Sequence, residues 1–252
     1  MTRLLQGKRA VVTGGANGIG AAIVRELAKA GVAKGAILDL PTTVVATVAP
    51  EGWDEIAVDL RDDHSIREAF AEVVAALETI DVLVAAAGIV PAWTSIGELD
   101  PEEWDEVFRV NARGVMRTIQ EARAGMSEGG AIVVIASQNA WRGSEHLASY
   151  TASKHAALGL VRSVALELGP HGIRVNAIGP GSVATDAYVG RLRRREAAGG
   201  ATVEQALTRE AQGTTLQRLT TVEDVARASL FLASDLASGV AGHILPVGPA
   251  TR

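Results

Sequence analysis

Two side chains suited to proton transfer lie four residues apart in the segment 150–154. In a helix, residues i and i+4 share one face, so the phenol of Tyr150 and the ammonium of Lys154 would be neighbours. A free phenol loses its proton near pH ~10, and a nearby cation lowers that pKa because it favours the phenolate. The pair predicts a tyrosine that acts as a general acid or base, although the same spacing also occurs in pairs that only pack or face solvent.

Two further features favour the catalytic interpretation. Ser137 lies thirteen residues before Tyr150, just after an apolar run at 131–135. A glycine-rich turn, Thr13 to Gly20, follows the first apolar run and precedes a stretch with helical spacing at 21–30, which Gly31 would end. The order of strand, glycine turn and helix predicts a nucleotide site, since glycines let a pyrophosphate approach the positive end of the helix. A tight turn without a ligand is the alternative.

Asp39, after the apolar run 36–38, indicates which cofactor this turn would bind. In doubly wound folds an acid at the end of the second strand accepts hydrogen bonds from an adenosine ribose, and its charge would repel a ribose phosphate. Leu40 and Pro41 follow it, and the glycine turn contains no basic residue. The pattern favours NAD over NADP, unless Asp39 only ends a strand and begins a turn.

The composition limits the class of protein. The 252 residues are 48% apolar, contain no linker-like stretch and carry a net charge of -5, so we expect one domain over 1–252 and no main role in binding nucleic acid or anionic membrane. The absence of cysteine excludes disulfides and thiol chemistry, and fits a reducing compartment. No apolar run approaches the ~20 residues of a membrane span, and residues 1–10 lack a signal-peptide core. We therefore expect a soluble, cytoplasmic protein with no metal site.

Short β-branched runs alternate with amphipathic stretches, which is typical of a parallel sheet covered by helices on both faces. The residues at 100–103 combine an N-cap, a proline and an acid, and predict a long helix that runs past Asn111; Thr221 marks another helix start. The polar segment 186–215 lies where a substrate lid would be placed. The predicted strands are 9–13, 36–39, 56–58, 82–85, 132–135, 175–178 and 243–247.

In combination, these motifs resemble those of the short-chain dehydrogenase/reductase family over nearly the whole chain. The matching residues are the turn at 13–20, Asp59-Leu60, Asn111, Ser137, the Tyr150/Lys154 pair and the segment 180–185. The resemblance implies a single doubly wound Rossmann domain with a seven-stranded, mainly parallel sheet, in a homodimer or homotetramer. The cofactor-binding residues that it implies are Gly14, Asn17, Gly18, Ile19, Gly20, Asp39, Asp59, Leu60, Ala87, Gly88, Tyr150, Lys154, Pro180, Gly181, Val183 and Thr185.

The resemblance also implies a role for each catalytic residue. Tyr150 would exchange a proton with the substrate oxygen while hydride passes to or from the nicotinamide, and Ser137 would hydrogen-bond that oxygen. Lys154 would lower the pKa of Tyr150 and bind the nicotinamide ribose, and Asn111 would hold a water that links Lys154 to solvent. Taken alone, Asn111 could face solvent and Ser137 could be a turn residue at a strand end.

Three segments depart from the family pattern. Residues 85–88 read Ala-Ala-Ala-Gly where the family usually begins with asparagine, so we expect a looser site with the needed glycine retained as Gly88. At the C-terminus, 246–250 lack the usual Val-Asp-Gly-Gly, which puts the usual subunit contact there in doubt. Residues 138–141, Gln-Asn-Ala-Trp, replace the familiar Ala-Gly after the serine, and we expect them to shape the substrate site.

The substrate is the least determined part. By resemblance, the substrate residues are Trp93, Gln138, Trp141, His146 and Tyr188, in a mainly apolar cleft, although each tryptophan could instead belong to the core and His146 could be a plain loop residue. The arginine-rich run 191–195 could close over an anionic substrate, but we expect a solvated helix face.

The sequence thus predicts an NAD-dependent enzyme that interconverts a secondary alcohol and a ketone, possibly cyclic, aromatic or polyol-like. An NADPH-dependent reductase of free or carrier-bound ketones is the first alternative. A non-catalytic NAD-binding sensor or scaffold is the second.

Overall fold

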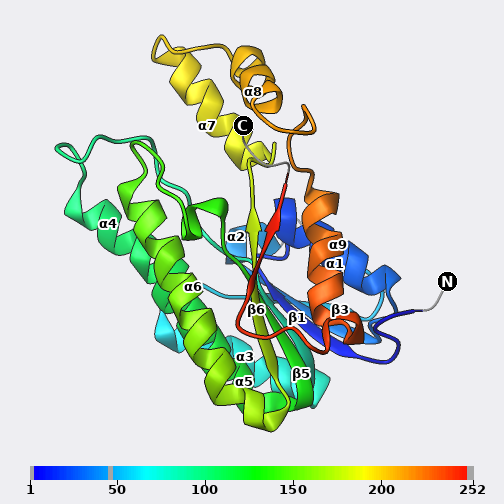
Figure 1. Ribbon diagram of the computed structural model, residues 1–252. Coiled ribbons are helices and arrows are strands. Elements are labelled where there is room, and N and C mark those ends of the chain that lie inside the picture. Colours follow the sequence, from blue (N-terminus) through cyan, green and yellow to red (C-terminus); the bar gives the residue numbers. More distant parts are fainter. Residues whose placement is uncertain (1–2, 45–47, 249–252) are drawn as a thin grey trace.

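A computed structural model of the protein, which describes residues 3–44 and 48–248, contains a parallel sheet of seven strands in the order β3-β2-β1-β4-β5-β6-β7 (Figure 1). All neighbouring strands pair in parallel, and the order reverses between β1 and β4. This confirms the predicted doubly wound fold. The strands are β1 Arg9–Thr13, β2 Lys34–Asp39, β3 Trp53–Ala57, β4 Ile80–Ala85, β5 Met126–Ile135, β6 Arg174–Pro180 and β7 Ile244–Val247.

Helices cover both faces of the sheet (Figure 1). On one face α1 and α9 pack against each other, and on the other α3, α5 and α6 enclose the larger core. Beyond the carboxyl ends of the strands stand α7 and α8, within the segment predicted as a lid (Figure 1). The helices are α1 Gly18–Lys29, α2 Pro41–Val44, α3 Asp63–Leu77, α4 Pro101–Phe108, α5 Val115–Gly125, α6 Ala148–Leu168, α7 Asp186–Ala197, α8 Val203–Gln212 and α9 Val222–Ala233.

Some predicted boundaries were wrong, and β3 shows why. The strand begins at Trp53 and ends at Ala57, whereas the sequence predicted 56–58. Its exposed polar positions hide the strand from a search for apolar runs. Its start is fixed by Trp53, whose ring covers Gly35 of β2: a Cβ on that glycine would lie 2.3 Å from the ring. Packing across the strand pair therefore sets the boundary. At the other edge of the sheet, β7 begins one residue later than predicted, at Ile244.

The helix predicted from residue 100 does begin there, because the Asp100 carboxylate accepts a hydrogen bond from the backbone N–H of Glu102 at 2.9 Å. It continues past Asn111 as predicted, but not as one regular α-helix. A π-helical turn, Arg109–Gly114, separates α4 from α5. Such turns are frequent at functional sites, and this one contains Asn111. The predicted start at Thr221 is also present, with a reciprocal cap between Thr221 and Asp224.

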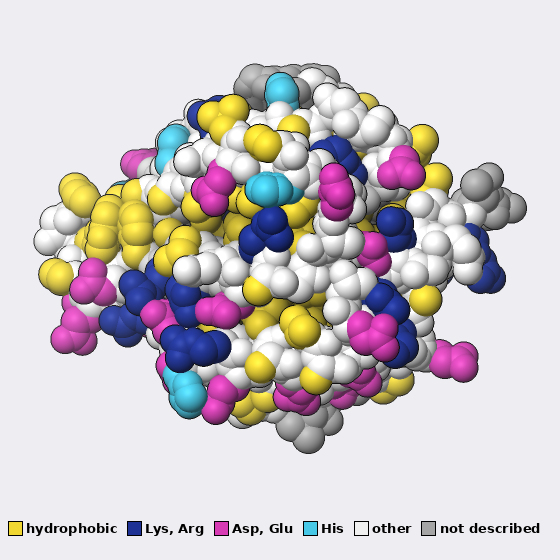
Figure 2. Space-filling model, turned by 90° about the horizontal axis from the view of Figure 1, so that it is seen from below, with side chains coloured by type: hydrophobic (Ala, Val, Ile, Leu, Met, Phe, Trp, Pro, Cys, Tyr) yellow, Lys and Arg dark blue, Asp and Glu magenta, His cyan; other side chains and the backbone are white. Residues whose placement is uncertain are grey.

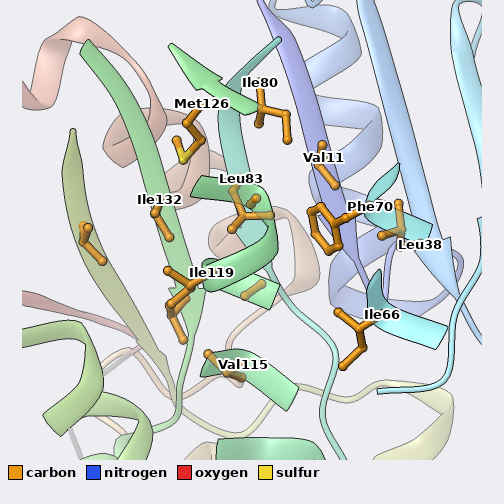
Figure 3. Packing of buried hydrophobic residues seen from close by; sticks show 14 of the residues in the cluster. Val11, Leu38, Ile66, Phe70, Ile80, Leu83, Val115, Ile119, Met126 and Ile132 are labelled. Atoms are coloured by element: carbon orange, nitrogen blue, oxygen red, sulfur yellow. The ribbon is translucent and has the colours of Figure 1, made fainter. Parts of the chain in front are cut away.

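The larger core lies between the sheet and helices α3 and α5 (Figure 3). Phe70 of α3 points toward Val11 of β1 and Leu38 of β2, and Leu83 of β4 faces Ile119 of α5 (Figure 3). Apolar burial of this kind contributes about 25 cal/mol for each Å² removed from water. The core thus holds β1, β2 and β4 in fixed positions. It also fixes the ends of these strands, from which the glycine turn and Asp39 extend.

The surface carries charges of both signs. On the face opposite α7 and α8, acidic and basic side chains are interspersed around small apolar areas, without an extended region of one sign (Figure 2). None of the helices in the described part of the chain combines the length and apolar character needed to cross a membrane.

We predict that Phe70→Ala lowers the free energy of unfolding by about 3–5 kcal/mol, because it removes a fully enclosed ring from this core. The measurement is urea unfolding followed by circular dichroism. The matched control is Phe231→Ala on α9, where the ring is 37% exposed and a loss of about 1 kcal/mol or less is expected. Equal losses in the two variants would contradict this description of the core.

Candidate functional site

A cavity of about 1240 Å³ lies at the carboxyl ends of the strands. This is where ligands bind in doubly wound sheets, next to the point at which the strand order reverses. All sixteen residues predicted to bind the cofactor line this cavity, as does Ser137. Of the predicted substrate residues, Trp93, Gln138 and Tyr188 also line it. The structure thus brings most of the predicted site together in one place.

The glycine turn approaches its neighbours too closely for any side chain. Gly14 has a φ of +65°, and a Cβ there would lie 2.6 Å from the Cα of Ala87. A Cβ on Gly20 would lie 1.9 Å from the carbonyl oxygen of Gly14. The turn therefore leaves the N-terminus of α1 bare toward the cavity. Backbone N–H groups and the helix dipole at that end suit a pyrophosphate, so this part of the chain fits a dinucleotide.

Asp39 lies at the end of β2 with its carboxylate fixed by the backbone. It accepts hydrogen bonds from the N–H of Ala16 at 3.1 Å and of Leu40 at 2.8 Å. The carboxylate thus ties the glycine turn to the second strand at the wall of the cavity. Its remaining lone pairs suit the hydroxyls of a ribose.

Asp59, which was also predicted to contact the cofactor, is engaged with a partner that the sequence analysis missed. The guanidinium of Arg61 holds both of its oxygens, with the shortest contact at 2.6 Å, and this hydrogen bonding lowers the pKa of Asp59. Arg61 also reaches Glu106 at 3.5 Å and lines the cavity. The carboxylates of Asp59 and Glu106 therefore already share the Arg61 guanidinium.

Ser137 and Tyr150 both line the cavity, and hydrogen bonding by the Ser137 hydroxyl is one of the influences on the pKa of the Tyr150 phenol. Ser137 follows β5 and is fixed by a bond from the N–H of Asn139 to its hydroxyl at 3.1 Å. Burial raises the pKa of the Tyr150 phenol, while the bond to Ser137 and the positive charge of Arg191 act in the opposite direction. The sequence analysis assigned that lowering to Lys154. In the structure Arg191, which the sequence analysis did not connect with Tyr150, is a cation that acts on the phenol.

Lys154 is one turn further along α6, with its Nζ 5.7 Å from the centre of the Tyr150 ring. The ammonium donates to the carbonyl oxygen of Ile135 at 3.0 Å, and burial lowers its pKa to about 8. A Cβ on Gly88 would lie 3.3 Å from Nζ. The lysine is thus anchored between β5 and the end of β4, with the remaining donors of its ammonium available to a ligand in the cavity.

Asn111 is fully buried and does not line the cavity. Its side chain forms a pair of 2.8 Å bonds with the backbone N–H and carbonyl of Ile89, and its amide also donates to Ser153 Oγ at 3.2 Å. A Cβ on Gly88 would lie 3.1 Å from its Oδ1. In the structure Asn111 therefore braces the chain after β4 against α6, which excludes the solvent-facing alternative.

The substituted strand end at 85–88 has a visible effect. Ala85 is paired in register with Thr13, and the buried Thr13 hydroxyl has no hydrogen-bond partner in the described part of the structure. The backbone N–H of Ala86 still donates to the Thr13 carbonyl at 3.1 Å. The bracing at this point therefore comes from backbone groups alone. At the other altered segment, Gly248 is the last described residue, and Pro249 and Ala250 lie outside the described range.

Two of the predicted substrate residues do not reach the cavity. Trp141 packs over Gly179 of β6, where a Cβ would lie 2.3 Å from its ring, and His146 is an exposed loop residue with a φ of +60°. The loop alternative holds for His146, whereas Trp141 is 39% exposed and therefore does not belong to the core either. Gln138, by contrast, follows Ser137 directly and lines the cavity.

The expectation of a solvated face at 191–195 was wrong for Arg191, which is buried and lines the cavity, whereas Arg194 lines the cavity and is exposed. Arg191 is only 9% exposed and lies over the ring of Trp93, with 4.0 Å from Cζ to the ring centre. The helical spacing of α7 turns this residue inward, while Arg193 is exposed. Glu210 of α8, which accepts a bond from the Tyr188 hydroxyl, is a further cavity residue that no sequence motif indicated.

Comparison with known proteins agrees with this geometry. A family model described as enoyl-(acyl carrier protein) reductase matches residues 14–248. The chain is 37% identical to (+)-cis,trans-nepetalactol synthase NEPS2 of Nepeta racemosa, over 97% of this chain and 93% of that protein. It is also 37% identical to the mitochondrial (-)-isopiperitenol/(-)-carveol dehydrogenase of Mentha piperita, over 96% and 92% of the two chains. The chain belongs to the short-chain dehydrogenase/reductase family.

The solved structures agree as well. The ligand-free aldohexose dehydrogenase of Thermoplasma acidophilum superposes with a TM-score of 0.86 at 28% identity, covering 96% of this chain and 93% of that one. Membership of this family makes the protein an oxidoreductase that uses a nicotinamide cofactor. In the described part of the chain, no group of three or more histidine, aspartate or glutamate side chains could hold a metal ion.

We predict that the affinity for NADH falls as the pH rises through about 8, because Lys154 is charged below its pKa and neutral above it. Loss of one charge-assisted hydrogen bond is expected to weaken binding by roughly fivefold, or about 1 kcal/mol. NADH fluorescence titrations between pH 6.5 and 9.5 measure this. In Lys154→Met the inflection should disappear. An unchanged inflection in that variant would assign the titration to another group.

Proposed function

We propose that the protein is an NAD-dependent oxidoreductase that interconverts a secondary alcohol and a ketone, with Tyr150 as the general acid and base. The observation that carries the proposal is that Ser137, Tyr150 and Lys154 line one cavity, with Tyr150 and Lys154 one helical turn apart on α6. A bound nicotinamide would accept or supply the hydride. The residues of the chain bind and orient the reactants and move the proton.

In the direction of reduction, the Tyr150 hydroxyl would give its proton to the substrate oxygen, and in oxidation the phenolate would take it. Ser137 would donate a hydrogen bond to the same oxygen as negative charge develops there, which stabilises the transition state more than the ground state. Its bond from the N–H of Asn139 fixes the hydroxyl in advance. The Lys154 ammonium, held by the Ile135 carbonyl, would bind the ribose and keep a positive charge close to the phenol.

The preference for NAD rests on Asp39. Its carboxylate is fixed at the cavity wall by the N–H groups of Ala16 and Leu40 and would accept bonds from ribose hydroxyls, whereas a phosphate there would meet a negative charge. The NADPH alternative draws support from Arg61, a cation at the cavity wall. Because Arg61 is already shared by Asp59 and Glu106, we favour NAD.

The substrate class is proposed from the cavity and the relatives together. Trp93 and Tyr188 give the substrate side an aromatic character, which suits a cyclic or aromatic alcohol. The names of the relatives refer to isopiperitenol and carveol in one case and to aldohexoses in another. The homo-oligomeric state and the cytoplasmic location stay predictions, as does the single domain.

We predict that the wild type binds NADH more tightly than NADPH, and that Asp39→Ala reduces this difference by about tenfold or more, because it removes a charge from the ribose site. Fluorescence titration of each reduced cofactor measures the two affinities without any substrate. A wild type that prefers NADPH would contradict our account of Asp39 and make reduction of ketones the better proposal.

We predict that Tyr150→Phe lowers kcat/KM for oxidation of a broad panel of secondary alcohols by about 10²–10⁴-fold, because the general acid–base group is lost. The affinity for NADH should stay within about twofold, since the variant removes one hydroxyl at the substrate oxygen. Stopped assays with NAD and direct titration of NADH measure the two quantities. If the variant binds NADH normally and oxidises the panel as fast as the wild type, the non-catalytic alternative replaces this proposal.

A further inference from the structure

The guanidinium of Arg191 is enclosed but incompletely bonded. The side chain projects from α7, is 9% exposed, and has no hydrogen-bond partner for Nε or Nη2 in the described structure. These two nitrogens form one edge of the guanidinium, and this edge can donate two parallel hydrogen bonds to the oxygens of one carboxylate. A buried charged group with open donors costs free energy unless a ligand satisfies them.

Two aromatic rings lie close to the Arg191 guanidinium. Its Cζ lies 4.0 Å from the centre of the Trp93 ring and 6.0 Å from that of Tyr188. Stacking on an aromatic face stabilises the cation without using its N–H donors. The arginine is therefore held in place while its open edge stays available.

Among the described residues, no carboxylate fills that edge. Glu210 attracts Arg191 electrostatically, but it commits one oxygen to the Tyr188 hydroxyl, and no ion pair within 4.0 Å joins it to Arg191 among the described residues. Arg194 adds a second positive charge nearby. Burial lowers the pKa of Arg191, which is the expected sign for a cation without a close counter-ion.

The position of Arg191 connects it to the reacting centre. Arg191, Trp93, Tyr188 and Tyr150 line the same cavity, and the charge of Arg191 acts on the phenol of Tyr150. The glycine turn, which suits the cofactor pyrophosphate, is not among the contacts of the Arg191 guanidinium. An anionic group at this edge would thus belong to the molecule that reacts at Tyr150.

We propose that Arg191 binds a carboxylate of the substrate through Nε and Nη2, so that the preferred substrates are oxo-carboxylates and their hydroxy-carboxylate counterparts. This inference rests on the proposed function and adds the substrate class to it. Trp93 acts as a positioning residue that holds the guanidinium at the cavity wall.

The test compares acids with neutral analogues of the same shape. The probes are 4-oxopentanoate, 5-oxohexanoate, 6-oxoheptanoate and 4-acetylbenzoate, each beside its primary amide, so that several distances between ketone and carboxylate are sampled. The enzymes are the wild type, Arg191→Gln, Arg191→Lys and the control Arg193→Gln, whose residue lies on the exposed side of α7. Ketone reduction with reduced cofactor gives kcat/KM. Calorimetry with the oxidised cofactor bound gives the affinity for each probe, and thermal unfolding checks the fold.

In the wild type and in Arg193→Gln, we expect at least one acid to exceed its amide in kcat/KM by about tenfold or more, the value of a charge-assisted bidentate contact. Arg191→Gln should bring that ratio close to one. Because the charge of Arg191 also acts on the Tyr150 phenol, its removal changes the turnover of acid and amide alike, and the ratio isolates the contact with the carboxylate. Arg191→Lys should recover only part of the preference, because a lysine lacks the planar fork.

Three results would overturn the inference. If the wild type reduces the ketones but treats every acid and amide alike, the carboxylate site is refuted and the proposed function stands. If Arg191→Gln weakens cofactor binding about tenfold without changing the acid-to-amide ratio, Arg191 serves a cofactor phosphate instead. If no probe is reduced and calorimetry shows no Arg191-dependent preference for acids, both proposals fail. Arg191-dependent binding of an acid without turnover would support the carboxylate site and contradict the proposed reaction.

Discussion

Two backbone segments, Gly14 after β1 and Ala87 after β4, contact each other, and this contact determines the positions of the other residues that line the cavity. These segments follow adjacent strands at the point where the strand order reverses, and they approach so closely that a Cβ on Gly14 would lie 2.6 Å from Ala87. The approach leaves the N-terminus of α1 free of side chains toward the cavity. It also brings Gly88, the next residue after Ala87, within reach of Asn111 and Lys154. One steric requirement thus joins the dinucleotide half of the site to its catalytic half.

The catalytic half depends on bonds between elements that are distant in sequence. Lys154 of α6 is tied to the end of β5 through the Ile135 carbonyl, and Asn111 of the π-helical turn is tied to Ile89 after β4. The π-helical turn inserts an extra residue into the helical ladder, which changes the direction of the side chains that follow. As a result the amide of Asn111 meets both the chain after β4 and Ser153 of α6. The phenol and the ammonium on α6 are therefore positioned by the sheet and not by their own helix alone.

The sequence was most informative where a residue type is required by backbone geometry. Gly14, Gly20 and Asp39 could be placed because a strand end, a close approach and a helix start each restrict the residues that fit. The alternation of strands and helices predicted a parallel sheet covered on both faces, and the family resemblance implied its doubly wound order. Trp141 and Arg191 could not be placed in this way, because residues distant in the sequence set their environments. Trp141 fills the space over Gly179, and Arg191 of α7 packs against Trp93, which lies in the loop after β4. A run of arginines is a solvated face in most helices, and only the packing of α7 shows which of its members turns inward.

The α7 helix connects the two halves of the cavity. At its start, Thr185 caps the helix through the N–H of Tyr188, and a Cβ on Gly18 would lie 3.5 Å from the Thr185 methyl. Six residues further on, about 9 Å along the helix axis, Arg191 lies against Trp93. At the nucleotide end the fixed charges at the cavity wall include the carboxylates of Asp39 and Asp59, whereas near Tyr150 they include the cations of Lys154 and Arg191. The α7 helix thus contacts the glycine turn at one end and carries the buried cation of Arg191 near the phenol. The position of Arg191 relative to Tyr150 therefore depends on where the glycine turn holds the start of the helix.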